Sequence, residues 1–329
     1  MKMRTEVDVE PAGSLIDYDS PVVMTGSCFA NEMAARLDEG LLPVLCNPFG
    51  VLYNPVSIAN MLRRVARGRE FGHDDLWFHN GRWLSFSHDT AFSSPDRQTI
   101  LEKLNRSFRN AHRFIRTASF LFVTFGTARI YRRADSGEVV ANCHKIPANF
   151  FTRELLTPGD IVSEWSEFIA ELSEFNPALQ IYFTVSPVRH WKDGAHGNQV
   201  SKSVLFVAIE ELLKSDSVAG YFPSYEIVTD DLRDYRFYAA DMLHPSSTAV
   251  EYIWEKFSGA FMSPESRSLY ERIASITRAT RHRLLNPQPD EVRLFSEKML
   301  NRISQLSDEL PSVDFSSLRR HFDDLLHSG

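Results

Sequence analysis

The feature that most restricts the fold of this chain is the regular alternation of short apolar runs with longer amphipathic segments. Apolar runs at 21–26, 119–126 and 179–187 end at Gly or Pro and have the length of buried strands. Apolar residues recur at helical spacing over 30–41, 55–68, 96–118, 157–177, 201–216 and 247–262. This alternation predicts a mostly parallel sheet with helices on both faces, a three-layer α/β/α sandwich.

Three other segments have their own patterns. Residues 128–140 resemble a hairpin around Asp135-Ser136-Gly137, and 218–234 a short strand that leads into a loop. From residue 263 onward the chain is charged, of mixed sign and helical, with a stripe of apolar residues at Leu269, Ile273, Ile276, Leu284 and Leu285. We therefore expect an α/β domain over 1–262 and a helical extension over 263–329. The extension is expected either to pack on the domain or to act as a lid or dimerisation arm.

Composition excludes several classes of function. The 329 residues carry a formal charge of -7, so the sequence shows no excess of basic residues that would bind nucleic acid. Because no apolar run reaches the roughly 18 residues of a membrane span, we expect no membrane partner. The first twenty residues lack the apolar core of a signal peptide, and the three cysteines show no zinc-site spacing. We expect a cytoplasmic protein with free thiols, no metal and no cofactor.

Polar residues follow the predicted strands at Gly26-Ser27-Cys28, at Gly126-Thr127 and around Arg189-His190. Ligands of open α/β sheets bind beyond the carboxyl ends of the strands, so these residues are expected to meet. A serine hydrolase needs a nucleophile, a base and a residue that orients the base. Ser27 would be the nucleophile, at a helix N-terminus whose N–H groups can stabilise an oxyanion. His244 and Asp241, three residues apart in "DMLHPSS", would be the base and the orienting acid.

Each of these residues also has a purely structural interpretation. Ser27 before a helix is an ordinary N-cap, and "DMLHPSS" can be a loop that starts the next helix. Cys28 is a rival nucleophile, because a helix N-terminus lowers the pKa of a thiol, but a residue just inside a helix usually points sideways rather than into the site, so Ser27 is preferred.

Several motifs in the same order resemble one protein family. "TGSCFA" at 25–30 resembles the signature of the GSCFA family, which belongs with the SGNH/GDSL hydrolase superfamily. "NPFGVLYNP", "FGTARIY", "NCHKIP", "TVSPVRHW" and "DMLHPS" also resemble motifs of that family, so the resemblance runs from about residue 20 to about 260. It implies the same α/β/α fold, with Ser27 in the place of the superfamily's Gly-Asp-Ser serine. Asp241 and His244 match its Asp-x-x-His.

The sequence departs from the superfamily at the oxyanion hole. The usual Gly-x-Asn-Asp motif is absent, and Gly126-Thr127 stands after the matching strand. Gly50 is our candidate for the glycine donor, and Thr127 or Asn54 for the side-chain donor. We expect other polar residues to line the same pocket and to bind an acidic or sugar-like substrate, although they can equally be salt-bridged loop residues: Asn142, His144, Arg189 and His190.

The sequence thus predicts a serine esterase that acts on an O-acyl ester of a carbohydrate or small metabolite. Two alternatives remain open. An O-acyltransferase would use the same acyl-enzyme and a sugar hydroxyl as acceptor, and a binding module would keep the pocket without catalysis.

Overall fold

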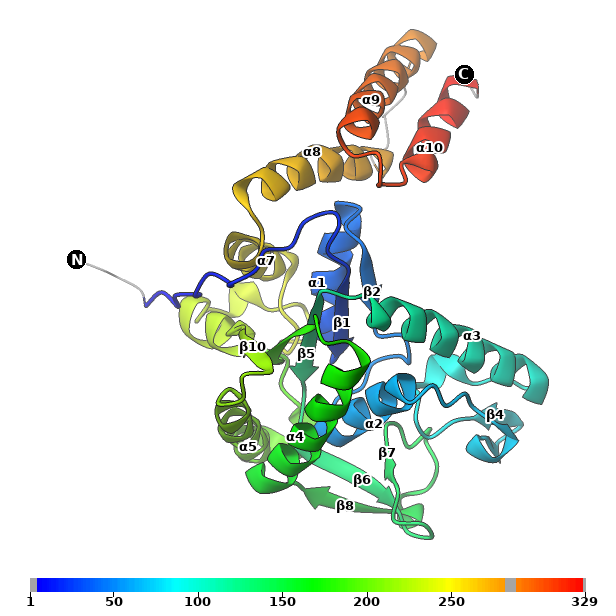
Figure 1. The fold of residues 1–329 in the computed structure, drawn as a ribbon, viewed down its shortest axis with the longest axis vertical. Coiled ribbons are helices and arrows are strands. Elements are labelled where there is room, and N and C mark those ends of the chain that lie inside the picture. The colour runs from blue at the N-terminus through cyan, green and yellow to red at the C-terminus, as the bar shows by residue number, and fades with distance from the viewer. Residues whose placement is uncertain (1–4, 282–287, 328–329) are drawn as a thin grey trace.

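The computed structural model describes residues 5–281 and 288–327, and its centre is a five-stranded parallel sheet (Figure 1). The strand order is β10-β9-β5-β1-β2, and every neighbouring pair runs parallel. The strands are β1 (Val22–Gly26), β2 (Val44–Cys46), β5 (Phe120–Phe125), β9 (Gln180–Val185) and β10 (Val218–Tyr221). The predicted sandwich with a central parallel sheet is confirmed.

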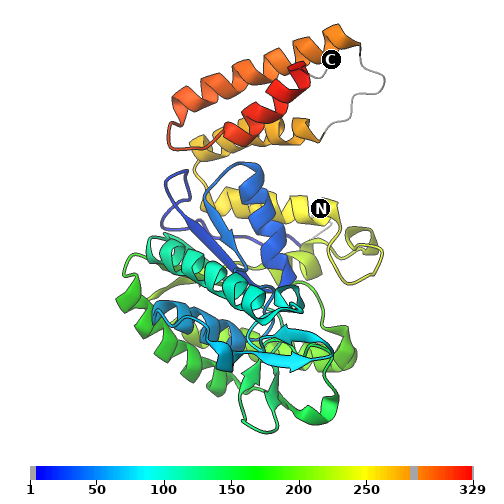
Figure 2. The same ribbon diagram turned by 90° about the vertical axis from the view of Figure 1, so that its right-hand side faces the viewer.

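Side chains alternate between the two faces of the sheet, as the pleat requires. In β5, Leu121, Val123 and Phe125 belong to one apolar core, whereas Phe120 and Phe122 belong to the other. The first core is covered by α2 (Pro55–Ala66), α3 (Arg97–Arg116), α4 (Pro158–Phe175) and α5 (Gly194–Leu212). The second is covered by α1 (Cys28–Glu39) and α7 (Ser247–Phe261), and Figure 2 shows these layers. Both faces of the central strands are therefore buried.

Smaller elements project from the α/β domain. The predicted hairpin is present as β6 (Arg129–Arg133) and β7 (Val139–Val140), and β8 (Phe151–Leu155) extends it to three antiparallel strands. A second small sheet pairs β3 (Trp77–His79) with β4 (Arg82–Leu84). The loop expected after β10 is instead the short α6 (Ser224–Glu226) followed by a π-helical turn, Ile227–Asp231. Burial of Ile227 and Val228 in the second core holds this turn in place.

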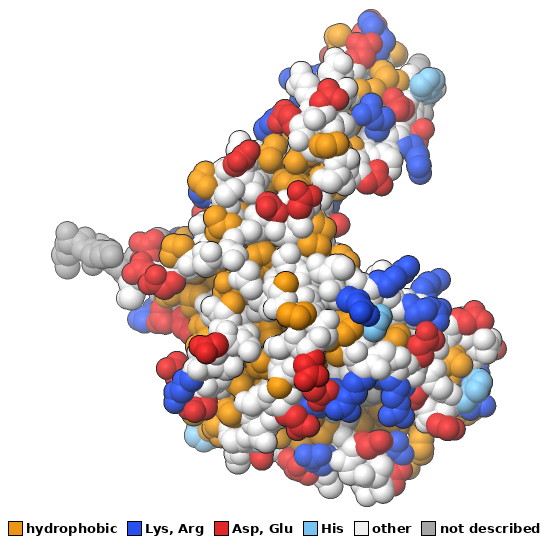
Figure 3. Space-filling model, viewed as in Figure 1, with side chains coloured by type: hydrophobic (Ala, Val, Ile, Leu, Met, Phe, Trp, Pro, Cys, Tyr) orange, Lys and Arg blue, Asp and Glu red, His pale blue; other side chains and the backbone are white. Residues whose placement is uncertain are grey.

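The C-terminal extension folds as α8 (Pro264–Thr280), α9 (Pro289–Glu309) and α10 (Ser316–His327). Ile273 and Ile276 are buried in the core that α1 and α7 share, and Leu269 packs against it, whereas Leu284 and Leu285 lie outside the described residues. The ring of Tyr270 lies 4.9 Å from that of Trp254 in α7. Figure 3 shows acidic and basic side chains interspersed on the exposed surface of the extension. The extension thus covers a flank of the domain, while a homodimer and a domain boundary at residue 263 stay predictions.

Tyr270 also fixes where the extension meets α1. A side chain at Gly40 would meet the Tyr270 ring at 2.2 Å, so a glycine is needed at this close contact. Because Gly40 caps the carboxyl end of α1, the extension lies against the end of that helix opposite to Cys28. None of the helices in 5–281 and 288–327 is long and apolar enough to cross a membrane.

Candidate active site

The three polar clusters that follow predicted strands meet at one edge of the sheet, as expected. They follow β1, β5 and β9, which are adjacent in the order β9-β5-β1. Parallel strands end at the same edge, so this adjacency explains why residues 100 positions apart in the sequence share a site.

The turn from β1 into α1 is tightly fixed by the backbone. Gly26 has φ +119, and a side chain there would meet the Thr124 carbonyl oxygen at 2.1 Å. Its N–H donates to Asn47 Oδ1 at 2.8 Å, and its carbonyl accepts from Leu52 N at 2.9 Å. Asn47 Nδ2 in turn donates to Asn31 Oδ1 at 2.7 Å. Only glycine fits at position 26, and the hydrogen bonds of Asn47, the residue after β2, hold the turn in place.

Ser27 is the N-cap of α1. Its Oγ accepts a hydrogen bond from Phe29 N at 3.3 Å, and its own N–H donates to Thr124 O at 3.1 Å. The residue is 1% exposed. The side chain therefore satisfies one of the free N–H groups of the helix start and faces the interior.

Cys28, the first residue of α1, faces the predicted base. Its Sγ lies 3.5 Å from His244 Nε2, and His244 Nδ1 lies 2.6 Å from Asp241 Oδ2. Within the described chain, Ser27 Oγ forms no hydrogen bond with His244. The expected pairing of His244 with Asp241 is confirmed, but the expected contact of its other nitrogen with Ser27 is made by Cys28. The reason is the cap geometry, which turns Ser27 inward and leaves the next side chain at the surface of the site.

The loop that carries His244 stabilises its own shape. Asp241 Oδ1 accepts from the backbone N–H groups of Leu243 and His244 at 2.9 and 3.0 Å. The His244 carbonyl accepts from Ala239 N at 2.7 Å. Met242 has φ +60, which closes the turn. These contacts all lie within residues 239–244, and they hold Asp241 and His244 together.

The protonation states follow from these contacts. Hydrogen bonds from His244 N–H, Leu243 N–H and the His244 ring lower the pKa of Asp241 to about 2, so the carboxylate is ionised at neutral pH. An ionised carboxylate only accepts, so His244 carries a proton on Nδ1, and in the neutral ring Nε2 is then the acceptor. Burial raises the pKa of the Cys28 thiol, although its own N–H and that of Phe29 oppose this. The thiol thus stays protonated at rest and can donate to His244.

A buried lysine lies close enough to Cys28 for an electrostatic interaction. Lys202 of α5 is 0% exposed, and its Nζ donates to the Ser186 carbonyl at 2.6 Å. Burial lowers the pKa of Lys202 to about 7, an ionised Cys28 would oppose this shift, and the positive charge of Arg189 adds to it. Sequence analysis missed this residue. Its signal is a lysine on the apolar face of α5, three residues before Leu205.

Comparison with known families identifies the chain. Residues 21–257 match the GSCFA family, and 273–328 match the "GSCFA domain protein, C-terminal domain". The protein belongs to the GSCFA family. No curated protein matches its sequence. One solved structure, of a carbohydrate esterase family 3 from Talaromyces cellulolyticus, is similar with a TM-score of 0.34 and 7% identity, over 76% of this chain and 98% of that chain.

The predicted oxyanion donors of this GSCFA protein are already engaged in hydrogen bonds. Gly50 N donates to Asn47 O at 2.8 Å, and Gly126 N and Thr127 N both donate to Tyr53 O, at 2.8 and 3.0 Å. Asn54 is the N-cap of α2, and its Nδ2, the group that would donate to an oxyanion, donates to Ser57 Oγ at 3.0 Å. Thr127 Oγ1 lies 3.0 Å from Ser201 Oγ. These groups hold the loops around the site and are not free to bind an oxyanion in this conformation.

The predicted substrate-binding residues separate into two groups. His144 Nε2 lies 2.9 Å from Ser85 O, and Asn142 Oδ1 accepts from His144 N at 2.8 Å. His190 Nδ1 pairs with Asp193 Oδ2 at 2.9 Å. All three stabilise loops, as the structural interpretation expected. Arg189 alone among the four lines the pocket beside Asp241.

Proposed function

We propose that this GSCFA protein cleaves O-acyl esters of a carbohydrate or small metabolite with a Cys28–His244–Asp241 triad. The observation that supports it most directly is the pair of distances on His244: 3.5 Å from Nε2 to Cys28 Sγ, and 2.6 Å from Nδ1 to Asp241 Oδ2. These distances support the proposal, because acyl transfer requires a nucleophile in contact with a base and the base in contact with an orienting carboxylate.

Each triad residue has a defined part in the reaction. Cys28 Sγ attacks the carbonyl carbon while its proton passes to His244 Nε2. The tetrahedral intermediate then expels the alcohol oxygen, which takes that proton and leaves a thioester on Cys28. Water, deprotonated by His244, attacks the thioester, and the acid and the free thiol are released. Asp241 keeps His244 in the required tautomer and stabilises the imidazolium that forms twice in the cycle.

Cys28 replaces Ser27 as the proposed nucleophile for two reasons. Ser27 is buried and caps α1, whereas Cys28 faces the base. This choice changes the expectation that Ser27 stands in the place of the serine of Gly-Asp-Ser: when the glycines are matched, Ser27 takes the place of the aspartate and Cys28 that of the serine. The thiol begins the helix, where backbone N–H groups lack intrahelical acceptors and can stabilise the oxyanion.

The acceptor of the acyl group separates a hydrolase from an acyltransferase. The side chain of His244 is 49% exposed, so water reaches the base directly, and this favours hydrolysis. Adding a sugar alcohol to the assay distinguishes the two reactions. An acyltransferase would form the sugar ester at the expense of the free acid.

The nucleophile can be identified by trapping the acyl-enzyme. After brief reaction with 4-nitrophenyl acetate and acid quenching, mass spectrometry of the peptides should find the acetyl group on Cys28 as a thioester that neutral hydroxylamine removes. The half-buried thiols of Cys46 and Cys143 are internal controls and should stay unmodified. An acetyl group on Ser27 that resists neutral hydroxylamine would restore the serine mechanism, and no acyl-enzyme on either residue would contradict the proposal.

A further inference from the structure

A pocket of about 500 Å³ adjoins the proposed triad. One wall is the catalytic loop itself, through Asp241, Met242 and Leu243. The opposite walls come from the segment after β9 and from the π-helical turn, which contributes Val228 and Thr229. The volume lies in the range of small-molecule sites, and π-helical turns occur frequently at functional sites. A molecule bound here would lie next to the acyl group under attack.

Arg189 is a half-buried cation in this pocket that forms no hydrogen bond or ion pair in the part of the chain that the structure describes. The two carboxylates of the pocket are used elsewhere. Asp241 pairs with His244, and Asp234 caps a short helical turn by accepting from Arg236 N at 2.9 Å. The second arginine of the pocket, Arg233, pairs with Asp230 at 2.5 Å. A partly desolvated guanidinium without an anion is costly, so Arg189 is available for an external one.

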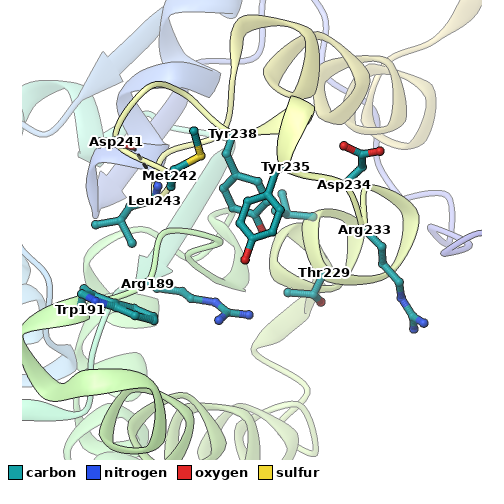
Figure 4. Close-up of a pocket in the computed structure, with 11 residues that line it drawn as sticks. Arg189, Trp191, Thr229, Arg233, Asp234, Tyr235, Tyr238, Asp241, Met242 and Leu243 are labelled. Atoms are coloured by element: carbon teal, nitrogen blue, oxygen red, sulfur yellow. Dashed lines mark hydrogen bonds between the residues drawn. The ribbon is translucent and has the colours of Figure 1, made fainter.

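Aromatic side chains surround this cation. Tyr235 and Trp191 are 76% and 52% exposed, and the Tyr235 ring lies 6.0 Å from that of Tyr238. Figure 4 shows the two tyrosine rings side by side, with the Arg189 side chain extended beneath them and the Arg233 and Asp234 side chains directed elsewhere. Exposed flat rings of this kind pack against a sugar or another ring and leave their polar ends free for hydrogen bonds.

We propose that Arg189 binds an anionic group of the substrate, a carboxylate or a phosphate, while the body of the molecule packs on Tyr235 and Trp191. The inference rests on the proposed function for the position of the ester, since the pocket shares Asp241 with the triad. It specifies the substrate class: an O-acyl ester whose alcohol part carries a negative charge.

The test compares esters that differ in charge and little in size: 4-acetoxybenzoate, neutral 4-acetoxybenzamide and 4-acetoxyphenyl phosphate. Binding is measured by calorimetry in Cys28→Ala, which cannot turn the esters over, and kcat/KM is measured in the chain with Cys28 intact. Arg189→Met should weaken binding and kcat/KM of the anionic esters roughly 10- to 100-fold and change those of the amide by less than about 3-fold. Arg189→Lys should restore part of the loss.

The control is Arg236→Met, which removes an arginine with a 74% exposed side chain from the same loop but outside the pocket. It should leave all three probes unchanged. Preference for the carboxylate or for the phosphate identifies which anion the substrate carries. Turnover without any Arg189-dependent preference for charge would overturn the anion pocket and leave the proposed function intact. Arg189-dependent binding of the anions without turnover would uphold the pocket and contradict the proposed function. Absence of anion binding in Cys28→Ala would also overturn the pocket.

Discussion

The two halves of the proposed triad are held in different ways. The turn at residues 26–28 is buried and tied to its surroundings, since Gly26 contacts the backbone of β5 and Ser27 N donates to Thr124 O at 3.1 Å. The loop with Asp241 and His244 lies at the surface, and these side chains are 47% and 49% exposed. Most of its hydrogen bonds are local, within residues 237–246.

Because of this difference, substitutions in the turn and in the loop should affect stability and catalysis differently. Gly26 and Ser27 are part of the core, so substitutions at these two residues should change the stability of the fold, whereas Cys28 is half-buried and faces the site. The hydrogen bonds that shape the loop are local, so substitutions in the loop should remove the proposed base while the domain stays folded. Four predictions test this separation, from the largest expected effect to the smallest.

Removing the thiol should have the largest effect. Cys28→Ala should lower kcat for short acyl esters by roughly 10⁴- to 10⁶-fold, because no other group in the site replaces the nucleophile. The melting temperature should change little, since the residue is only half-buried. Steady-state kinetics and calorimetry check both outcomes, and Cys143→Ala is the matched control. If Ser27→Ala causes the same loss of kcat in a folded protein, Cys28 is not the nucleophile.

Asp241→Asn tests whether the loop with Asp241 and His244 keeps its shape independently of the core. The amide keeps an oxygen for the N–H groups of Leu243 and His244 but offers an N–H where the His244 ring needs an acceptor, which disfavours the active tautomer. We expect kcat to fall by about 10²- to 10⁴-fold with an unchanged melting temperature. Asp216→Asn, at an exposed aspartate outside the pocket, should retain activity. A large drop in melting temperature in Asp241→Asn would show that the loop is not independent of the core.

Lys202 tests whether a buried charge beside the turn costs stability. Because burial lowers the pKa of Lys202 from its ordinary 10.5 to about 7, the folded state binds fewer protons than the unfolded state between these values. The contribution of Lys202 to the stability of the wild-type chain should therefore rise with pH from about 7 to 10.5. Below pH 7 the full cost of burying the charged lysine applies. Lys202→Met removes the penalty.

The melting temperature of Lys202→Met relative to the wild type should be highest near pH 6 and should fall as the pH rises through this window. Loss of the hydrogen bond to Ser186 O adds an offset that does not depend on pH. Lys214→Met, at a side chain that is 67% exposed, should show no such trend. A difference that is constant with pH would mean that Lys202 is charged in the folded protein throughout this range.

The smallest effect is expected from the helix cap. Ser27→Ala removes the acceptor for Phe29 N and should lower the free energy of unfolding by about 1 kcal/mol, as measured by urea denaturation. Activity should stay within about 10-fold of the wild type. Ser27→Thr, which keeps the oxygen, should retain more of the stability than Ser27→Ala does. Equal stability of all three chains would show that the cap contributes nothing.

Much of the architecture was predictable from local patterns. The buried runs became β1, β5 and β9, and the amphipathic segments became α1 to α5 and α7. Asp241 and His244 were predictable as a pair because a three-residue spacing brings them together within one turn. In contrast, β2 was missed, because its three residues have too few side chains to show a strand period.

Sequence alone determined the layers and the pairing of Asp241 with His244, because each depends on residues close together in the chain. Tertiary structure decided which of two adjacent side chains meets His244. The backbone at Gly26, fixed by contacts with β5 and Asn47, sets the direction in which α1 begins, and a change of one residue rotates a side chain by about 100° around a helix. It also decided that Lys202 is buried near Cys28 and that Arg189 forms no ion pair within residues 5–281 and 288–327, since both depend on segments far apart in the sequence that only folding brings together.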